Sequence, residues 1–303
     1  MGNFTFKGLF LAIVFIVLGS LSIQAADGLI TKQITIKLEK AGTLPDKIGS
    51  TKKKQITNLK IIGEINGTDL RMIREMAGKD VRDNDTDGML SVLDLSDAKI
   101  VEGGDYYFIY HSYYSTSNDK IGDYTFHGCS VLTSLTLPSG LTEIGEGAFA
   151  ACSGLTSITL PSGVTSIGDM TFYACRGLTS ITLPSGLTEI GDDAFQYCSG
   201  LTSIYVYTEK LPKMGSSVFG DCDAKKCTVY VPKGTYDDYW LSEVGYFENI
   251  VEFDPTGINN IITSNDAKEL SRYSLNGQRL SAPSKGLNIV KYSDGSVKKV
   301  VVQ

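Results

Sequence analysis

The chain has 303 residues, of which 42% are hydrophobic and 20% charged, and its formal net charge is −6 at pH 7. That length exceeds one ordinary compact domain, so one elongated domain with appendages or two compact domains is expected. The acidic balance argues against a nucleic-acid partner. Nucleic-acid binding relies on clustered lysine and arginine, and the one basic cluster is the short run at residues 52–54.

Residues 1–25 have the pattern of a secretory signal peptide. Lys7 precedes an apolar run from Gly8 to about Leu18, and small residues then lead to Ala25, after which cleavage is expected. A membrane-spanning helix needs about 20 apolar residues, and this run is shorter. We therefore predict an exported protein, secreted or at the cell surface, whose mature chain has no transmembrane segment.

Residues 26–120 are predicted to form an N-terminal cap with irregular repeats and an aromatic insertion. Residues 56–61 and 90–95 alternate apolar and polar side chains, as strands do. Between them, residues 66–78 predict a helix, with Asn66 or Thr68 near its N-terminal cap and Gly78 at its end. These strands are expected to be fainter copies of the regular repeats that follow.

Three aspartates at alternate positions, Asp83, Asp85 and Asp87, have the spacing of an EF-hand calcium loop. Such a loop leads into a second helix, whereas residues 90–95 here predict a strand. The side chain of Asp94 is also shorter than that of the glutamate which binds calcium through both carboxylate oxygens in such a loop. An acidic solvated loop between two repeats is therefore the preferred interpretation, with calcium binding as the alternative. No other metal and no cofactor is predicted.

An aromatic insertion, residues 103–120, interrupts the repeat register and reads GGDYYFIYHSYYSTSNDK. Exposed tyrosine offers a large rigid contact area with a hydroxyl, which suits protein recognition and sugar stacking. The alternative is one irregular repeat whose aromatic side chains alternate between core and solvent. Five tyrosines of the insertion are predicted to contact a ligand: Tyr106, Tyr107, Tyr110, Tyr113 and Tyr114.

Residues 121–227 repeat with a period of 23 and then 24 residues, in units that begin at Cys129, Cys152, Cys175 and Cys198. Each unit opens with L-x-x-I-x-L, whose apolar positions share one face of a short strand. Such a strand buries that face only if its neighbours do the same, so the repeats should stack into a parallel sheet. A Pro-Ser-Gly turn follows. The return half, L-T-E-I-G-x-x-A-F-x-x-C, should bury Phe149, Phe172 and Phe195 in the same core.

The outward positions of these strands carry hydroxyl side chains. Thr136, Thr159 and Thr182 recur at the repeat period, and the row ends at Tyr205. Solenoids often bind extended ligands on their strand face, so these four residues are predicted to contact a ligand. The alternative is that threonine simply suits a solvated strand position.

Five of the six cysteines fall on the repeat period: Cys129, Cys152, Cys175, Cys198 and Cys222. We expect an inward column of small buried apolar residues, because side chains on such a column run parallel instead of converging. Cys227 alone lies off this column, so Cys222–Cys227 is the disulfide candidate. The sequence contains no C-x-x-C pair, so a zinc site is not predicted.

The C-terminal part changes composition twice. Residues 228–254 predict a last strand and aromatic cover for the open end of the core, and residues 255–271 predict a polar linker. Residues 272–303 carry two hairpin signals, Asn276-Gly277 and Asp294-Gly295, between short strand-prone runs.

The repeat, with its half I-G-x-x-A-F-x-x-C from Ile121 to about Asp221, resembles the leucine-rich repeats of the BspA-like family of bacterial surface proteins. The resemblance implies a β-rich leucine-rich-repeat solenoid, in which short helix or turn segments lie on the side opposite a parallel sheet of short stacked strands. Residues 228–254 resemble the C-terminal cap of that family. Residues 272–303 resemble short tails of exported proteins of Gram-negative anaerobes, which implies a possible sorting signal; a small β appendage is the alternative.

The family resemblance also implies an adhesin-like role, with an extracellular protein or glycan as the partner. The sequence has no G-x-S-x-G, H-E-x-x-H or P-loop spacing, so we predict that the protein is not an enzyme. His127 occupies a variable repeat position that we expect to be exposed, and His111 lies in the aromatic insertion. The alternatives are a glycan-handling component, either a carbohydrate-binding accessory or a cryptic hydrolase, and a purely structural surface element.

Overall fold

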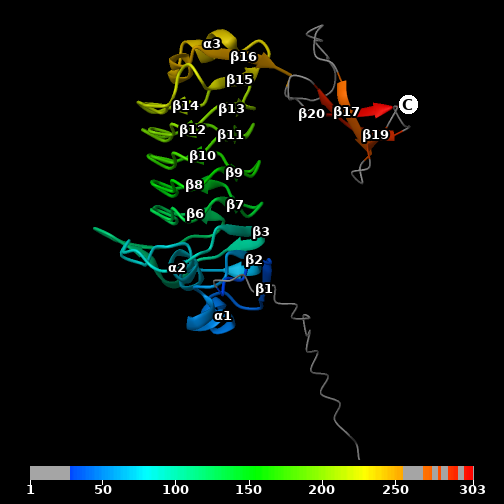
Figure 1. Ribbon diagram of the computed structural model, residues 1–303. Helices are drawn as coiled ribbons and strands as arrows, with labels where there is room; N and C mark the ends of the chain where they lie inside the picture. The colour runs from blue at the N-terminus through cyan, green and yellow to red at the C-terminus, as the bar shows by residue number, and fades with distance from the viewer. Residues whose placement is uncertain (1–27, 255–268, 275–278, 281–285, 293–296, 303) are drawn as a thin grey trace, which may run out of the picture. The chain divides into compact units, whose positions relative to one another are not determined.

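The computed structural model describes residues 28–254, 269–274, 279–280, 286–292 and 297–302 (Figure 1). The chain divides into two compact units, Met1–Pro255 and Thr256–Gln303. The predicted signal peptide, most of the predicted linker and both predicted hairpin turns lie outside the described residues. No helix in the described ranges is both long and apolar enough to cross a membrane.

The first unit begins with two strand-helix pairs. The elements are β1 (Ile34–Leu38), α1 (Leu44–Lys52), β2 (Asn58–Ile65), α2 (Gly67–Met76) and β3 (Val92–Ile100). The predicted helix at residues 66–78 is confirmed as α2. Its N-terminus is a capping box: the Asn66 side chain accepts from the backbone N–H of Thr68, and the Asp69 side chain accepts from the backbone N–H of Asn66. Asp69 also accepts from the backbone N–H groups of Gly42 and Leu44, which fixes the start of α1 against α2.

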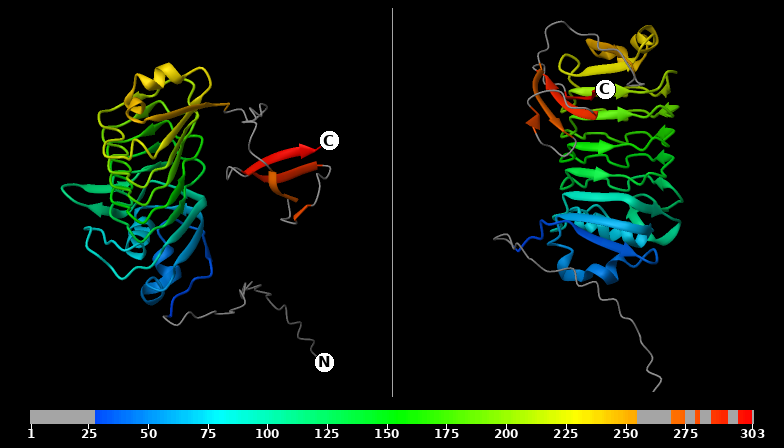
Figure 2. Two further views of the ribbon diagram at one scale, coloured as in Figure 1. Left: turned by 45° about the horizontal axis from the view of Figure 1, so that its top comes forward. Right: turned by 90° about the vertical axis from the view of Figure 1, so that its right-hand side faces the viewer.

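The repeats build a parallel sheet that continues from these first strands. The strands are β7 (Ser134–Thr136), β9 (Ser157–Thr159), β11 (Ser180–Leu183), β13 (Ser203–Val206), β15 (Thr228–Pro232) and β16 (Asn249–Phe253). Within the described ranges the sheet has nine strands in the order β1-β2-β3-β7-β9-β11-β13-β15-β16 (Figure 2). Equivalent repeat positions pair, for example Leu135 with Ile158, so the register follows the sequence period. The predicted solenoid of stacked strands is confirmed.

A second, shorter ladder runs along the return halves of the repeats. It consists of β6 (Lys120–Ile121), β8 (Glu143–Ile144), β10 (Ser166–Ile167), β12 (Glu189–Ile190) and β14 (Lys213–Met214). These two-residue strands pair in parallel in the order β14-β12-β10-β8-β6, a five-stranded sheet among the described residues. Each places its first residue outward and its isoleucine or methionine toward the core.

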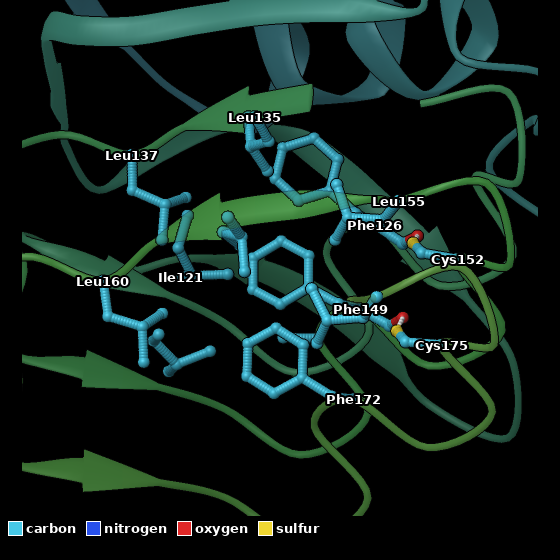
Figure 3. Packing of buried hydrophobic residues seen from close by; sticks show 14 of the residues in the cluster. Ile121, Phe126, Leu135, Leu137, Phe149, Cys152, Leu155, Leu160, Phe172 and Cys175 are labelled. Carbon is cyan, nitrogen blue, oxygen red and sulfur yellow. Dashed lines mark hydrogen bonds between the residues drawn. The ribbon is translucent and has the colours of Figure 1, made fainter. Parts of the chain in front are cut away.

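The core between the two ladders is a stack of identical side chains (Figure 3). The phenylalanine rings at positions 126, 149, 172, 195 and 219 lie with centroids 5.1 to 5.6 Å apart and planes within 15° of parallel. Phe149, Phe172 and Phe195 are fully buried, as predicted. The rings stack in register because the period places the same residue at the same point of every turn.

The periodic cysteines form a second column beside the rings. The Sγ of Cys175 donates to the carbonyl of Phe149 at 3.1 Å. In the same way, Cys152, Cys198 and Cys222 donate to the carbonyls of Phe126, Phe172 and Phe195. A small side chain with a weak donor therefore satisfies a buried carbonyl in every turn. The residue before each cysteine is left-handed, with φ of 57 to 71° at Gly128, Ala151, Ala174, Tyr197 and Asp221. Because such different residues adopt it, stacking between turns fixes this conformation.

The far end of the unit is closed by α3 (Tyr236–Trp240) and the 3₁₀ helix η1 (Glu243–Tyr246), which precede β16. Aromatic residues of this segment were expected to cover the core here. Tyr239 and Phe247 are buried and do so, but Tyr236 and Trp240 are 39% and 48% exposed. Those two rings stack on each other at the surface instead, at 6.2 Å.

The second unit is an antiparallel sheet with the strand order β18-β17-β19-β20. Its strands are β17 (Glu269–Ser274), β18 (Arg279–Leu280), β19 (Gly286–Tyr292) and β20 (Val297–Val302). Val290 is buried within it. The strand-prone runs of the tail therefore do form strands, while a sorting role stays a prediction.

Candidate binding surfaces

The aromatic insertion folds into a β-hairpin made of β4 (Gly103–Ile109) and β5 (Tyr113–Thr116). Its first strand packs directly on the N-terminus of α2. A Cβ added to Gly67 would lie 1.9 Å from the carbonyl oxygen of Asp105, so only glycine allows this approach. The backbone N–H of Asp105 donates to the Thr68 hydroxyl at 2.9 Å, and that of Ile109 donates to the Val81 carbonyl at 2.7 Å. The hairpin is therefore fixed to the cap at both ends of β4.

A buried arginine holds the base of the hairpin to the first repeat. Arg74 on α2 is fully buried, and its Nη1 donates to three carbonyls, those of Tyr124, Thr125 and His127, at 3.0 to 3.2 Å. Its guanidinium carbon lies 4.6 Å from the ring centroid of Phe108, which places the cation over the aromatic face. One side chain thus joins three segments that are distant in sequence.

The tyrosines of the hairpin divide into an inner and an outer set. Tyr106, Tyr110 and Tyr113 are 49%, 66% and 65% exposed, and we name these three the outer tyrosines. Tyr107 is buried, so the prediction that it contacts a ligand is wrong, while for the half-buried Tyr114 ligand contact stays a prediction. The fold places these two against the protein instead.

The inner tyrosines are used in packing. The Tyr107 hydroxyl donates to the carbonyl of Asp123 at 2.9 Å, and burial raises the pKa of this phenol to about 12. Tyr114 packs its ring 5.8 Å from Phe108 and 5.2 Å from Tyr124. These contacts make the hairpin a rigid support for the outer tyrosines.

The outer tyrosines form two aromatic contacts at the hairpin surface. The rings of Tyr106 and Tyr113 lie 5.0 Å apart across the two strands, and the ring of Tyr110 lies 4.1 Å from that of His111. His111 is exposed as well. The hairpin therefore presents four aromatic or imidazole rings to solvent within eight positions of the chain.

A groove of about 530 Å³ lies between the hairpin and the short-strand ladder. Tyr107, Tyr114 and Ser115 line one wall, and the turns of β6, β8, β10 and β12 line the other. Its carboxylates are already engaged by the fold. Asp123 accepts from the backbone N–H of Glu146, and Asp169 accepts in the same way from Asp192. Glu143 pairs with Lys120, and Glu189 pairs with Lys213.

The strand face of the nine-stranded sheet is the second candidate surface. Thr136, Thr159 and Thr182 are exposed there, as predicted, in one row on successive strands. The neighbouring row is structural: the hydroxyls of Thr156, Thr179 and Thr202 each donate to the carbonyl of the threonine one turn earlier.

The hydroxyl row ends in an aromatic cluster. Tyr205 stacks on Tyr230 with centroids 4.6 Å apart and planes within 6°. Phe253 meets Tyr205 and Tyr207 edge to face, at 6.4 and 5.2 Å. We name these four residues the strand-face aromatic cluster. Tyr205 was predicted as a site residue, whereas Tyr230 and Phe253 were not. Tyr230 occupies the same outward strand position as Tyr205 one repeat later, which was a usable signal in the sequence.

The calcium candidate is not supported by the geometry. Asp85 pairs with Lys79 at 2.9 Å and Asp87 with Lys54 at 2.7 Å, while Asp83 lies between Arg74 and His127. The three carboxylates therefore turn toward different basic side chains and do not converge. Among the described residues, no three histidine, cysteine, aspartate or glutamate side chains form a group that fits a metal ion.

His127 is half-buried, which corrects the expectation of an exposed position. Its Nδ1 lies 3.2 Å from a carboxylate oxygen of Asp83. Partial burial of Asp83 would raise its pKa, but the interaction with His127 and the nearby charges of Lys79 and Arg74 outweigh this and lower the pKa of Asp83. The pair lies beside Arg74, at the junction where the hairpin meets α2 and the first repeat.

The disulfide candidate Cys222–Cys227 is not formed. All six cysteines are free and buried, and Cys222 donates its Sγ hydrogen to the carbonyl of Phe195 as a member of the column. Burial raises the pKa of both Cys222 and Cys227 to about 12. These thiols stay protonated at neutral pH and are poor nucleophiles.

The repeat is matched by a protein-family model. The model of the BspA type leucine rich repeat region matches residues 115–237 in six copies. The match includes every regular repeat and the end of the aromatic hairpin. Comparison with curated proteins gave no match.

Three solved structures are similar to this chain. A leucine-rich-repeat protein of T. pallidum is 28% identical, with a TM-score of 0.37, over 46% of this chain and 67% of its own. The pneumococcal vaccine antigen PcpA is 16% identical, with a TM-score of 0.38, over 68% of this chain and 61% of its own. A leucine rich cell surface protein of Faecalibacterium prausnitzii is 21% identical, with a TM-score of 0.27, over 62% of this chain and 51% of its own.

Proposed function

This chain is a BspA-type leucine-rich-repeat protein across residues 115–237, and from that premise we propose that it is an exported, adhesin-like binding protein. Its recognition element in this proposal is the aromatic hairpin. The export step rests on the signal-peptide pattern of residues 1–25. The partner is an extracellular protein, and the repeats serve as the rigid scaffold that carries the hairpin.

The observation that carries the proposal is the exposure of the outer tyrosines on an anchored support. Exposed aromatic side chains in a group mark interaction surfaces, because water contact with them is unfavourable. Tyrosine loses little conformational entropy on binding, since only two torsion angles need to be fixed. The Arg74 and Tyr107 contacts hold the hairpin in place before a ligand arrives, which reduces the entropy cost further.

A protein partner suits this surface better than a small molecule. The outer tyrosines stand on a hairpin that projects from the solenoid and do not line an enclosed pocket (Figure 2). A projecting aromatic element fits into a groove of a partner, where central tyrosines commonly supply most of the binding energy. No catalytic step is proposed. In the neighbouring groove, four carboxylates bond to backbone N–H groups or to lysine, and that of Glu146 accepts from the Tyr124 hydroxyl.

The test is a binding screen of the full chain against extracellular-matrix proteins and glycans. It is repeated with a variant in which Tyr106, Tyr110 and Tyr113 are changed to Ser, while Tyr107 and Tyr114 stay because they pack inward. The matched control changes two exposed tyrosines elsewhere, Tyr197→Ser with Tyr236→Ser. We expect the hairpin variant to lose protein binding by about 100-fold or more, as truncation of interface hot spots does. Equal binding by the hairpin variant and the native chain would refute the proposal.

A glycan ligand on the strand face is the second candidate, favoured by the strand-face aromatic cluster. The stacked rings of Tyr205 and Tyr230 lie at the end of a row of exposed hydroxyls, and sugars are bound by such combinations of aromatic surface and polar groups. A glycan hit that survives the hairpin variant and disappears in Tyr205→Ala with Tyr230→Ala would assign the function to this face. A hit that survives both variants would exclude it.

A further inference from the structure

The nine-stranded sheet has two open edges. Within the described ranges β1 pairs only with β2, and β16 pairs only with β15, so the outer side of each strand has no partner strand. Both strands are five residues long and run parallel to the rest of the sheet. They lie at opposite ends of the solenoid (Figure 1). An unpaired edge is a template for another strand.

The two end segments carry opposite charge along the sequence, and at the first end Lys53 and Lys54 pair with Glu75 and Asp87. From position 28 to 54, around β1 and α1, the sequence has seven lysines and two acidic residues. From position 233 to 254, around α3, η1 and β16, it has six acidic residues and one lysine. The chain is acidic as a whole, so the basic end is a local departure from its composition.

The acidic end also exposes apolar side chains. Leu241 is 84% exposed, Trp240 48% and Val251, on β16 itself, 45%. At the basic end, Ile34 and Ile36 of β1 are only partly buried. Burial of these groups would favour any contact that covers both ends.

From these observations we propose that the solenoid associates head to tail with a second copy of this chain, with β1 of one copy pairing in parallel with β16 of the next. A copy displaced along the solenoid axis continues the sheet in the same strand direction. Its basic end then meets the acidic end of its neighbour. Head-to-head and tail-to-tail contacts would instead place like charges together and require antiparallel pairing.

Charges on an edge strand can also serve to prevent association. Protective charges of one sign on both edges would repel in every arrangement. Here the signs differ between the ends, which blocks the two symmetric arrangements and leaves the head-to-tail one attractive. Because this contact is heterologous and does not close, it forms open chains of copies. The inference uses none of the outer tyrosines and is independent of the proposed ligand.

The experiment is sedimentation velocity on the full chain from on the order of 1 µM to 1 mM. The expected result is a sedimentation coefficient that rises with concentration and does not stop at a dimer. It should fall to the monomer value as the salt concentration rises from about 0.01 to 1 M, where the Debye length drops from ~30 to ~3 Å. A monomer at every concentration in low salt would overturn the proposal.

Charge-reversal variants give the decisive comparison. Lys32→Glu with Lys47→Glu makes the first end less basic, and Asp238→Lys with Glu248→Lys makes the second end less acidic; all four side chains are exposed. Each variant alone should lose association by tenfold or more. A mixture of the two should regain pairing, because the unchanged acidic end of the first variant then meets the unchanged basic end of the second. Arg176→Glu, exposed in the middle of the repeats, is the control and should associate like the native chain.

Folding of the variants is checked by thermal melting, which should match the native chain because the changed side chains are exposed. Association that persists in both single-end variants would overturn the proposal. A mixture that stays monomeric while its components are folded would overturn it as well.

Discussion

The regular repeats bury aromatic residues, and so does the junction around Arg74, where the hairpin meets α2 and the first repeat. The buried rings of the two regions have different partners. In the repeats each buried ring meets a copy of itself, as Phe172 does between Phe149 and Phe195. At the junction, Phe108 meets a guanidinium, two tyrosines and a histidine from other segments. The stability of the repeats is therefore the sum of similar contributions from each turn and from its contacts with the next turn. At the junction, stability depends on single side chains without a substitute.

This difference separates the periodic repeats from the hairpin, which has no period. A ladder of equal contacts tolerates changes on its outer surface, because its core positions are fixed by the period. The hairpin has no such period and is held by Arg74, whose partners lie up to 53 residues away in sequence. A hairpin that is fixed by a few long-range contacts takes no part in the repeat period, so a change in it leaves the register of the repeats unaltered.

The strongest test of the ladder is Phe172→Ala. We expect a loss of about 3–5 kcal/mol in the free energy of unfolding, because a fully buried ring with stacked neighbours on both sides leaves a cavity. Denaturant unfolding of the full chain measures the loss. Phe172→Leu is the matched control and should cost clearly less, since it refills most of the space. A loss well below 1 kcal/mol for the alanine variant would contradict the ladder.

The junction is tested by Arg74→Met, which keeps an apolar side chain of similar length and removes the guanidinium. The buried carbonyls of Tyr124, Thr125 and His127 then lose their donor, which should cost about 2–3 kcal/mol. Unlike Phe172→Ala, the effect should be concentrated in the hairpin. Amide hydrogen exchange should become faster at residues 103–116 and stay unchanged in β9 to β13. Uniform exchange changes along the repeats would show that the two regions are not separable.

The sequence predicted what the period controls. Positions that recur every 23 residues gave the strand register, the buried rings and the inward cysteine column, and the capping pattern at Asn66 gave α2. In each case one local rule, either the repeat period or helix capping, decides where a side chain points. The family resemblance agreed with the same residues.

The features that the sequence did not predict depend on contacts between segments that are distant in the chain. The register of β4 and β5 shifts between Gly103 and Phe108, so two successive residues, Tyr107 and Phe108, are both buried. Simple alternation cannot assign such a bulged strand. Arg74 looks like an ordinary solvated helix residue, because its acceptors are carbonyls of a distant turn. Phe253 joins the strand-face aromatic cluster only through β16, a strand that the sequence did not predict.

The smallest expected effect concerns the carboxylate at the edge of the junction. Asp83 has a left-handed backbone, with φ of 65°, and Asn accepts this conformation as readily as Asp does. Asp83→Asn therefore removes the charge beside His127 and Arg74 without adding backbone strain. At pH 6 it should cost about 1 kcal/mol or less, as partly exposed ion pairs do.

The pH dependence of this cost distinguishes a charge effect from a packing effect. The pKa of Asp83 is lowered from its ordinary value of 3.8 in the folded chain. Its stabilisation is therefore complete above that value and is lost as the pH falls through the lower, folded-state pKa. The difference in unfolding free energy between the native chain and Asp83→Asn should shrink steadily below about pH 4 and vanish once the carboxylate is protonated in both states. A difference that stays constant across this range would mean that Asp83 contributes shape to the junction and not charge.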